Sequence, residues 1–161
     1  TEINSLPEIQ QIAKERLTES FRYHTPFTPS TFVEERDALV KIGIMSVENA
    51  NQIPEIQEIA KQRMISSFRY HTPFTPDTFA QEREALVKAG VIKATEINQL
   101  LEIQEEAKRK LVASHNYHTP YTTETFIKER DEMVALGIVD VKTVDAWLQE
   151  TSASSGLPAT P

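Results

Sequence analysis

The heptapeptide YHTPFTP occupies residues 23–29 and returns unchanged at residues 70–76. It returns once more at residues 117–123 as YHTPYTT, with two substitutions. Both intervals are 47 residues, and the flanking sequences align without a gap. A period between about 20 and 50 residues is typical of proteins built from repeated supersecondary units. The spacing therefore predicts three tandem repeats, at residues 1–47, 48–94 and 95–141.

Two shorter segments follow the third repeat. Residues 142–150 enter the register of another repeat, and Trp147 stands where the earlier copies carry Leu6, Ile53 and Leu100. A larger apolar side chain at this position suits a terminal capping helix that covers the core. Residues 151–161 contain serine, glycine and proline and lack helical periodicity, so we expect a disordered tail or a linker.

Each repeat is expected to contain two main helices and a short one. Apolar and polar positions 9, 13, 17, 20 and 24 recur at helical spacing and predict the first main helix. Pro7 and Pro54 are tolerated only in a first turn, so a short lead-in helix breaks before each of them. The third repeat has Leu101 at this place. We therefore expect an unbroken helix over about residues 96–116 there.

The second main helix has signals at both ends. Thr28, Thr75 and Thr122 can cap its start, and a glycine followed by an aliphatic residue ends it, at Gly43, Gly90 and Gly137. No segment alternates with a period of two, which predicts an all-α fold. A single repeat of 47 residues buries little surface, so we expect the repeats to stack as a short solenoid. Three independent bead-like bundles are the alternative.

The bulk composition limits the classes of partner. The chain has 17 basic and 24 acidic residues, a formal net charge of -7, and no cysteine. An acidic surface disfavours nucleic acid as a partner, and no apolar run is long enough for membrane insertion. We expect a soluble protein; its compartment stays open, with the cytoplasm favoured, and so does its oligomeric state.

An arginine recurs in the middle of the predicted apolar face of the second main helix. Arg36 lies four residues after Phe32 and four before Val40, and a buried guanidinium requires hydrogen-bond acceptors. We predict a polar network in each repeat in which Glu35, His24 and Tyr23 join this arginine. Its other members are Glu82, Arg83, His71 and Tyr70 in the second repeat, and Glu129, Arg130, His118 and Tyr117 in the third. The network either fixes the angle between helices or forms a small binding site used three times.

The repeated loop is the predicted partner-binding face. Its aromatic, threonine and proline residues are the candidates for contact: Tyr23, Thr25, Pro26, Phe27, Tyr70, Thr72, Pro73, Phe74, Tyr117, Thr119, Pro120 and Tyr121. The alternative for Phe27, Phe74 and Tyr121 is that they pack between helices as structural anchors.

Catalytic chemistry finds little support in these residues. Histidines 24, 71 and 118 lie in separate repeats, too far apart to share one metal ion, and Ser20 with His24 lacks an oxyanion hole. No glycine-rich phosphate loop is present, and acidic residues surround the one segment that could suit a helix-turn-helix. We expect no enzymatic activity, no cofactor and no metal.

These observations predict a non-enzymatic scaffold or adaptor that binds protein or peptide partners. Repetition offers a partner several equivalent contacts, which raises the overall affinity above that of one site. A small-ligand or peptide-binding array with three sites, and a structural spacer of bead-like modules, are the alternatives.

Overall fold

In the computed structural model, the residues described are 2–22, 29–69, 76–117 and 123–154. Within these ranges the secondary structure is helical throughout, with no strand, which confirms the all-α prediction. The elements are η1 Ile3–Ser5, α1 Pro7–Arg22, α2 Ser30–Lys41, α3 Val47–Asn51, α4 Pro54–Arg69, α5 Pro76–Lys88, α6 Ala94–Asn98, α7 Leu101–Tyr117, α8 Thr123–Ala135 and α9 Val141–Ser154.

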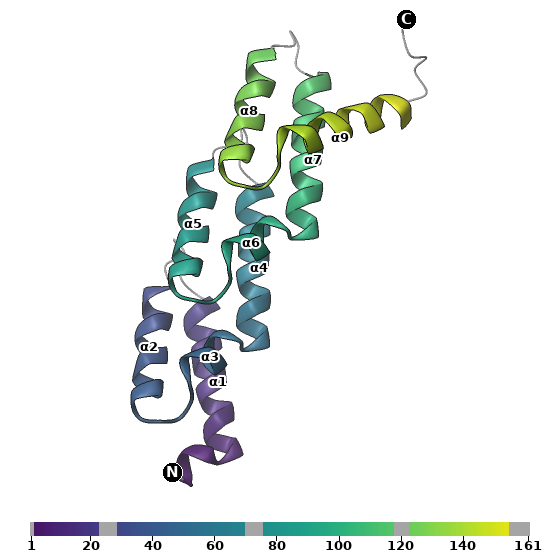
Figure 1. Cartoon of the computed structure of the whole chain (residues 1–161). Helices are drawn as coiled ribbons and strands as arrows, with labels where there is room; N and C mark the ends of the chain where they lie inside the picture. The colour runs from purple at the N-terminus through teal and green to yellow at the C-terminus, as the bar shows by residue number, and fades with distance from the viewer. Residues whose placement is uncertain (1, 23–28, 70–75, 118–122, 155–161) are drawn as a thin grey trace, which may run out of the picture.

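The long helices pack as hairpins that follow one another in space. Helix α1 packs on α2, α4 on α5, and α7 on α8, and we name these pairs the first, second and third hairpin. Helix α4 also packs between α1 and α7, while α9 packs on α7 and α8. Figure 1 shows α1, α4 and α7 along one side of the molecule and α2, α5 and α8 along the other.

The glycine stops form as predicted. Gly90 has a φ of 80°. Its N–H donates to the Val87 carbonyl at 3.0 Å, and the Val91 N–H donates to the Leu86 carbonyl at 3.1 Å. This pair of bonds is the Schellman motif, which requires a left-handed residue after the helix. The same two bonds recur after α2 and after α8.

The expected unbroken helix over residues 96–116 is wrong. Helix α6 ends at Asn98 and α7 begins at Leu101, so the break occurs even without proline. The Gln104 side chain donates from Nε2 to the Asn98 carbonyl and to the Ile138 carbonyl, both at 2.7 Å. The Asn98 carbonyl is thereby satisfied by a side chain rather than by a helical N–H. Gln57 makes the equivalent contacts to Asn51 and Val91 in the second hairpin.

One apolar core runs through all three hairpins. Its buried side chains extend from Leu17 in α1 to Val144 in α9 as a single cluster. Inside each hairpin an aromatic pair packs edge to face, with ring centroids 5.2 Å apart for Phe21 and Phe32 and 5.3 Å apart for Phe68 and Phe79. Such pairs contribute about 0.5–1.5 kcal/mol beyond the burial of their area.

Each hairpin covers an apolar face of the next one. Leu6 is 47% exposed in the first hairpin, whereas the equivalent Ile53 in the second is 2% exposed. Ile42 is 61% exposed, whereas the equivalent Ala89 is 7% exposed. The difference arises because the first hairpin packs against the second at this face, as the contact of α1 with α4 shows.

The last helix is longer than predicted. We expected a cap over residues 142–150, but α9 runs from Val141 to Ser154, so the first residues of the predicted tail are helical. Trp147 is partly buried and packs against the core, in agreement with a capping role. Residues 155–161, the rest of the predicted tail, lie outside the described residues.

Candidate functional site

Arg36 is buried and bonds to groups of the following hairpin. Arg36 is 8% exposed to solvent. Nη1 donates to Asn51 Oδ1 at 2.9 Å and to the Ala89 carbonyl, which is 53 residues away, at 2.6 Å. The guanidinium also lies 5.6 Å from the ring centroid of Phe32. Arg36 therefore ties α2 to α3 and to the end of α5.

Arg83 repeats this arrangement between the second and third hairpins. Its Nη1 donates to Asn98 Oδ1 and to the Leu136 carbonyl, both at 2.7 Å. Burial lowers the pKa of Arg83 from its ordinary value, although a guanidinium remains protonated at any physiological pH. We name the Arg36 and Arg83 contacts the arginine clamps.

Arg130 does not form a clamp. It bonds only to the carboxylate of its neighbour Asp131, with both bonds at 3.2 Å, within the described part of the chain. The position equivalent to Asn51 and Asn98 is Asp145 in α9, and no bond joins it to Arg130 there. The expectation of an arginine buried in the same way in every repeat is therefore wrong for the third.

The acceptors of the clamp differ from those expected. Arg36 forms no bond with Glu35 in the described ranges; its Nε donates instead to Asp37 Oδ1 at 3.0 Å, and its Nη1 to Asn51 and Ala89. Likewise, no bond joins Glu82 to Arg83 or Glu129 to Arg130 among the described residues. The other predicted members of the network lie outside the described residues or have no described side chain: Tyr23, His24, Tyr70, His71, Tyr117 and His118.

Sequence reasoning missed the asparagine and the glutamine that complete each clamp. Asn51 and Asn98 accept the arginine, and Gln57 and Gln104 hold the chain break beside it. A signal was present, since both residue types are identical at equivalent positions of all three repeats. Their identity in all three copies would have pointed to them.

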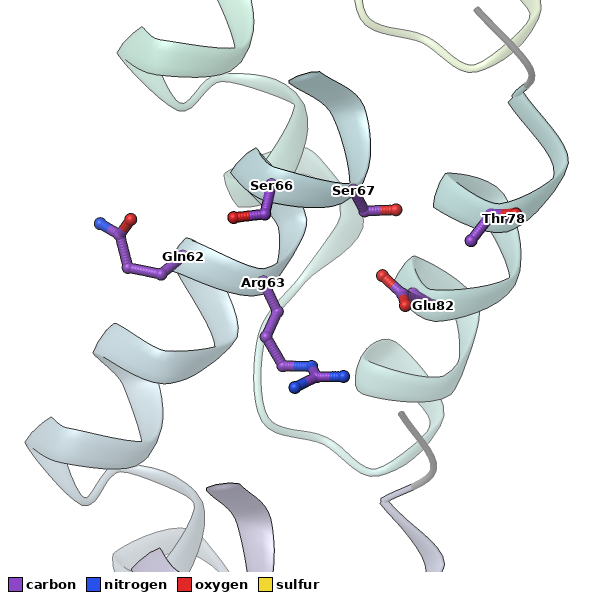
Figure 2. Close-up of a pocket in the computed structure, with 6 residues that line it drawn as sticks. All are labelled: Gln62, Arg63, Ser66, Ser67, Thr78 and Glu82. Carbon is purple, nitrogen blue, oxygen red and sulfur yellow. The ribbon is translucent and has the colours of Figure 1, made fainter. Parts of the chain in front are cut away.

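A polar hollow of about 360 Å³ lies between the helices of the second hairpin (Figure 2). Figure 2 shows Ser67 directed from α4 toward α5, and the Glu82 carboxylate directed back toward α4. Arg63 extends along the hollow, with its guanidinium away from Ser67. Its lining residues are Gln62, Arg63, Ser66, Ser67, Thr78 and Glu82. We name this hollow the second polar groove.

The first hairpin has a hollow at the equivalent place. It measures about 570 Å³ and is the first polar groove. Its lining includes Ser20, Thr31 and Glu35, which align with Ser67, Thr78 and Glu82 after a shift of 47 residues. The third hairpin carries Ser114, Thr125 and Glu129 at these positions. We name the serine, threonine and glutamate of each hairpin the polar trio.

Buried oxygen atoms of the polar trio lack hydrogen-bond partners. Among the described residues, the hydroxyls of Ser20, Ser67 and Ser114 have none, and neither has Glu35 Oε2. Ser67 is 9% exposed and Ser114 is 3% exposed. Native proteins satisfy most buried polar atoms with protein groups or ordered water, so the recurrence of this exception makes the position a candidate for contact with a solvent or ligand group.

The third hairpin carries a buried carboxylate that the other two hairpins lack. Glu106 replaces the isoleucine of the other two copies and is buried against Arg109 of the same helix. A hydrogen bond from Arg109 lowers the pKa of Glu106 below its ordinary value. Burial lowers the pKa of Lys110, whose ammonium donates to the Arg69 carbonyl at 3.2 Å.

Substituting Glu106→Gln should make stability less dependent on pH. A carboxyl whose pKa is lowered by folding stabilises the protein above its unfolded pKa, near 4.3, and this contribution disappears as the pH falls through the folded pKa. We expect the variant to lose about 1–2 kcal/mol at neutral pH, and the difference from the wild type to shrink in acid. Urea unfolding between neutral and acidic pH measures this difference in the free energy of unfolding, with Glu105→Gln as the control. A difference that stays constant with pH would contradict the ion-pair account.

The predicted partner-binding loop residues cannot be placed. Residues 23–28, 70–75 and 118–122 lie outside the described residues, and the side chain of Tyr117 is likewise not described. The polar trio nevertheless flanks each loop in sequence, since Ser67 precedes residue 70 closely and Thr78 follows residue 75 closely. Ser67 therefore lies near the end of α4 and Thr78 near the start of α5, the two helix ends that this loop segment joins in sequence.

Metal and membrane sites were also sought in the part of the chain that the structure describes. No group of three acidic, histidine or cysteine side chains there is placed to hold a metal ion. The helices in these ranges are all too short or too polar to cross a bilayer. The expectation that no metal is bound stays a prediction, because His24, His71 and His118 fall outside these ranges.

Comparison with known proteins gives no relative for this architecture: no protein-family model, no curated protein and no solved structure matches the chain.

Proposed function

We propose that the chain is a short α-solenoid of three stacked repeats that serves as a non-enzymatic scaffold for protein or peptide partners. The observation that carries this proposal is the recurrence of the arginine clamp. Arg36 bonds to Asn51 and Ala89, and Arg83 bonds to Asn98 and Leu136 at equivalent positions. Neighbouring hairpins joined by the same bonds share one relative orientation. Equivalent surfaces are then presented at regular intervals along one rigid body.

The loop face and the polar grooves form the binding surface in this proposal. Ser67 and Thr78 lie near the two helix ends that the loop segment joins in sequence, so one partner can contact both. Several equivalent contacts on a rigid frame raise the overall affinity because each further contact is intramolecular. The candidate loop residues are those of the repeated heptapeptide, with Tyr23 and Phe27 and their equivalents as the aromatic anchors.

The test is a comparison of captured partners. The immobilised chain is exposed to cell extract beside a variant with alanine at Tyr23, Phe27 and their equivalents, and beside a control with glutamine at Glu8, Glu55 and Glu102, which are exposed. We expect at least one protein that the wild type and the control retain and the loop variant loses. A protein set identical for all three chains would refute the loop face as the binding surface.

Stacking predicts that one repeat does not fold alone. The isolated segment 48–94 would expose faces that the neighbouring hairpins cover, including Ile53 and Ile56, which are at most 2% exposed in the chain. We expect its circular dichroism to lack a cooperative thermal transition, while the full chain melts in one. A stably folded segment would favour the bead-like spacer over the scaffold.

The second candidate function is an array of three small-ligand sites. The buried serine hydroxyls without partners favour it, because they occur at the same position of every hairpin. It predicts a stoichiometry of about three ligands per chain, whereas the scaffold predicts one extended partner. Isothermal titration calorimetry with an identified partner or ligand measures this stoichiometry and so distinguishes the two candidate functions.

A further inference from the structure

The first hairpin, with η1 before it, carries a set of clamp acceptors to which no arginine of the described residues donates. Asn51 and the Ala89 carbonyl accept the bonds from Arg36. Their equivalents 47 residues earlier are Asn4 and Ile42. Asn4 Nδ2 donates to the Ile42 carbonyl at 2.9 Å, and no donor of the described ranges reaches Asn4 Oδ1. Figure 1 shows η1 and the end of α2 at the N-terminal end of the row of hairpins.

These acceptors are held in place without an arginine. Gln10 Nε2 donates to the Asn4 carbonyl at 2.7 Å and to the Ile44 carbonyl at 2.6 Å. At the clamped junction of the second and third hairpins, the equivalent Gln104 makes the same two contacts, both at 2.7 Å. The bond from the asparagine amide to the carbonyl recurs there too, at 3.2 Å. The site in the first hairpin is therefore preorganised, which lowers the free-energy cost of binding a guanidinium.

Apolar side chains beside these acceptors are exposed in the first hairpin and covered at the junctions. Ile3 is 69% exposed, whereas the equivalent Ile97 in α6 is fully buried. Leu6 and Ile42 are also exposed, and their equivalents in the second hairpin are buried. We name Ile3, Asn4, Leu6 and Ile42 the open clamp face. An exposed apolar set beside organised polar acceptors is typical of an interaction surface.

The other end of the row is closed by a helix that lacks the clamp acceptors. In the register of the repeat, Asp145 of α9 stands at the place of Asn4, and Thr151 stands at the place of Gln10. Helix α9 has no break of the kind that the glutamine holds elsewhere. It packs on α7 and on α8, which is the helix that carries Arg130. The two ends of the chain therefore differ in kind.

These contacts select the partner that fits the open clamp face. Equivalent faces are covered twice within the chain, each time by a hairpin that carries an arginine four residues after a phenylalanine. A second copy of the chain offers no such hairpin, because Arg36 and Arg83 are bonded to their own acceptors and α9 packs on the helix of Arg130. A further hairpin of the same repeat type has the arginine and the apolar end that the face requires.

We propose that the open clamp face is the docking site of a further helical hairpin of this repeat type, which enters in the same order as the hairpins within the chain. Its arginine donates to Asn4 Oδ1 and to the Ile42 carbonyl, and its apolar end covers Ile3 and Leu6. The array is extended at this end and not at α9. This inference rests on the stacking in the proposed function but not on its loop face, so either can fail without the other.

The experiment joins a copy of residues 48–94 directly ahead of residue 1 of the full chain. Residues 1–4 and 95–98 share the sequence TEIN, so the added repeat meets the first hairpin through the connection by which the second meets the third. We expect urea unfolding in one transition, at a higher midpoint than for the unextended chain. An added repeat that unfolds in a separate, earlier transition would overturn the proposal.

Asn4→Ala separates docking from mere attachment of the added repeat. In the unextended chain the Asn4 side chain bonds only within the first hairpin, so we expect the folding equilibrium constant to fall by less than about fivefold. In the extended chain it also accepts the added arginine, so the fall should be about tenfold larger or more. Methionine in place of the added arginine should abolish this extra effect. Equal effects of Asn4→Ala in both chains would overturn the proposal.

A measurement on the unextended chain tests the competing occupant and needs no added repeat. A second copy seated on the open clamp face would form a dimer that depends on Ile42. Because Ile42 is exposed, Ile42→Asp leaves the core unchanged. We expect the wild type and this variant to have the same sedimentation coefficient at every concentration in analytical ultracentrifugation. A wild-type dimer that Ile42→Asp dissolves would assign the face to a second copy and overturn the proposal.

Discussion

Substitution Arg83→Met should destabilise the chain by about 2–4 kcal/mol. Methionine fills a similar volume but donates no hydrogen bond, so Asn98 Oδ1 loses its partner and the Leu136 carbonyl loses one of two. Both acceptors lie at the junction of the second and third hairpins. Urea unfolding followed by far-ultraviolet circular dichroism measures the change in the free energy of unfolding.

Arg130→Met is the matched control for this prediction. Arg130 has the same residue type on the same helix face, and its guanidinium lies 5.8 Å from the ring centroid of Phe126. Its hydrogen bonds, however, go to exposed Asp131 rather than to another hairpin. We expect a loss below about 1 kcal/mol, as for a surface ion pair. Equal losses in the two variants would mean that the clamp contributes nothing beyond the local contacts of an arginine.

The position of the only tryptophan allows a second measurement on Arg83→Met. Trp147 lies in α9 and packs on the core beside the third hairpin. Its fluorescence therefore reports on the end of the chain, whereas circular dichroism reports on all helices. We expect the two unfolding curves to coincide in the wild type and in Arg130→Met, and to separate in Arg83→Met because the hairpins no longer unfold as one unit.

Local features of the fold could be predicted from the sequence, since they depend on residues close together in the chain. The glycine stops require only a left-handed residue and an aliphatic one after the helix, so Gly43, Gly90 and Gly137 identify all three ends. The burial of Arg36 follows from its place between Phe32 and Val40 on a helical face. The all-α class follows from the same periodicity.

Contacts between distant residues could not be predicted in the same way. The acceptors of Arg36 include a carbonyl 53 residues away, and no local pattern selects one carbonyl among many. The break before Leu101 depends on the Gln104 side chain reaching back to the Asn98 carbonyl, an interaction that propensity rules do not contain. The orientation of Ser67 toward Glu82 depends on how α4 and α5 pack. Copy-to-copy identity marked Arg36, Asn98, Gln104, Ser67 and Glu82 without stating their roles.

Gly90→Ala should also destabilise the chain strongly, through the same junction as Arg36. Its φ of 80° lies in the left-handed region, where a side chain costs about 1–2 kcal/mol. A methyl group there would also lie 2.9 Å from Asn51 Nδ2, which is closer than van der Waals contact allows. Asn51 is 6% exposed and cannot move away without releasing Arg36. We expect a total loss of about 2–4 kcal/mol in urea unfolding.

Gly43→Ala separates the two causes of this loss. Its φ of 81° gives the same backbone strain, but the added methyl group would lie 3.4 Å from Asn4 Nδ2, and no arginine of the described residues bonds to Asn4. We therefore expect only about 1–2 kcal/mol there. The part of the stability loss in Gly90→Ala that exceeds the loss in Gly43→Ala should be non-additive with the loss in Arg36→Met, because both changes act through Asn51. Full additivity in that double-mutant cycle would show that Gly90 and the clamp are independent, and that Asn51 does not couple the first hairpin to the second.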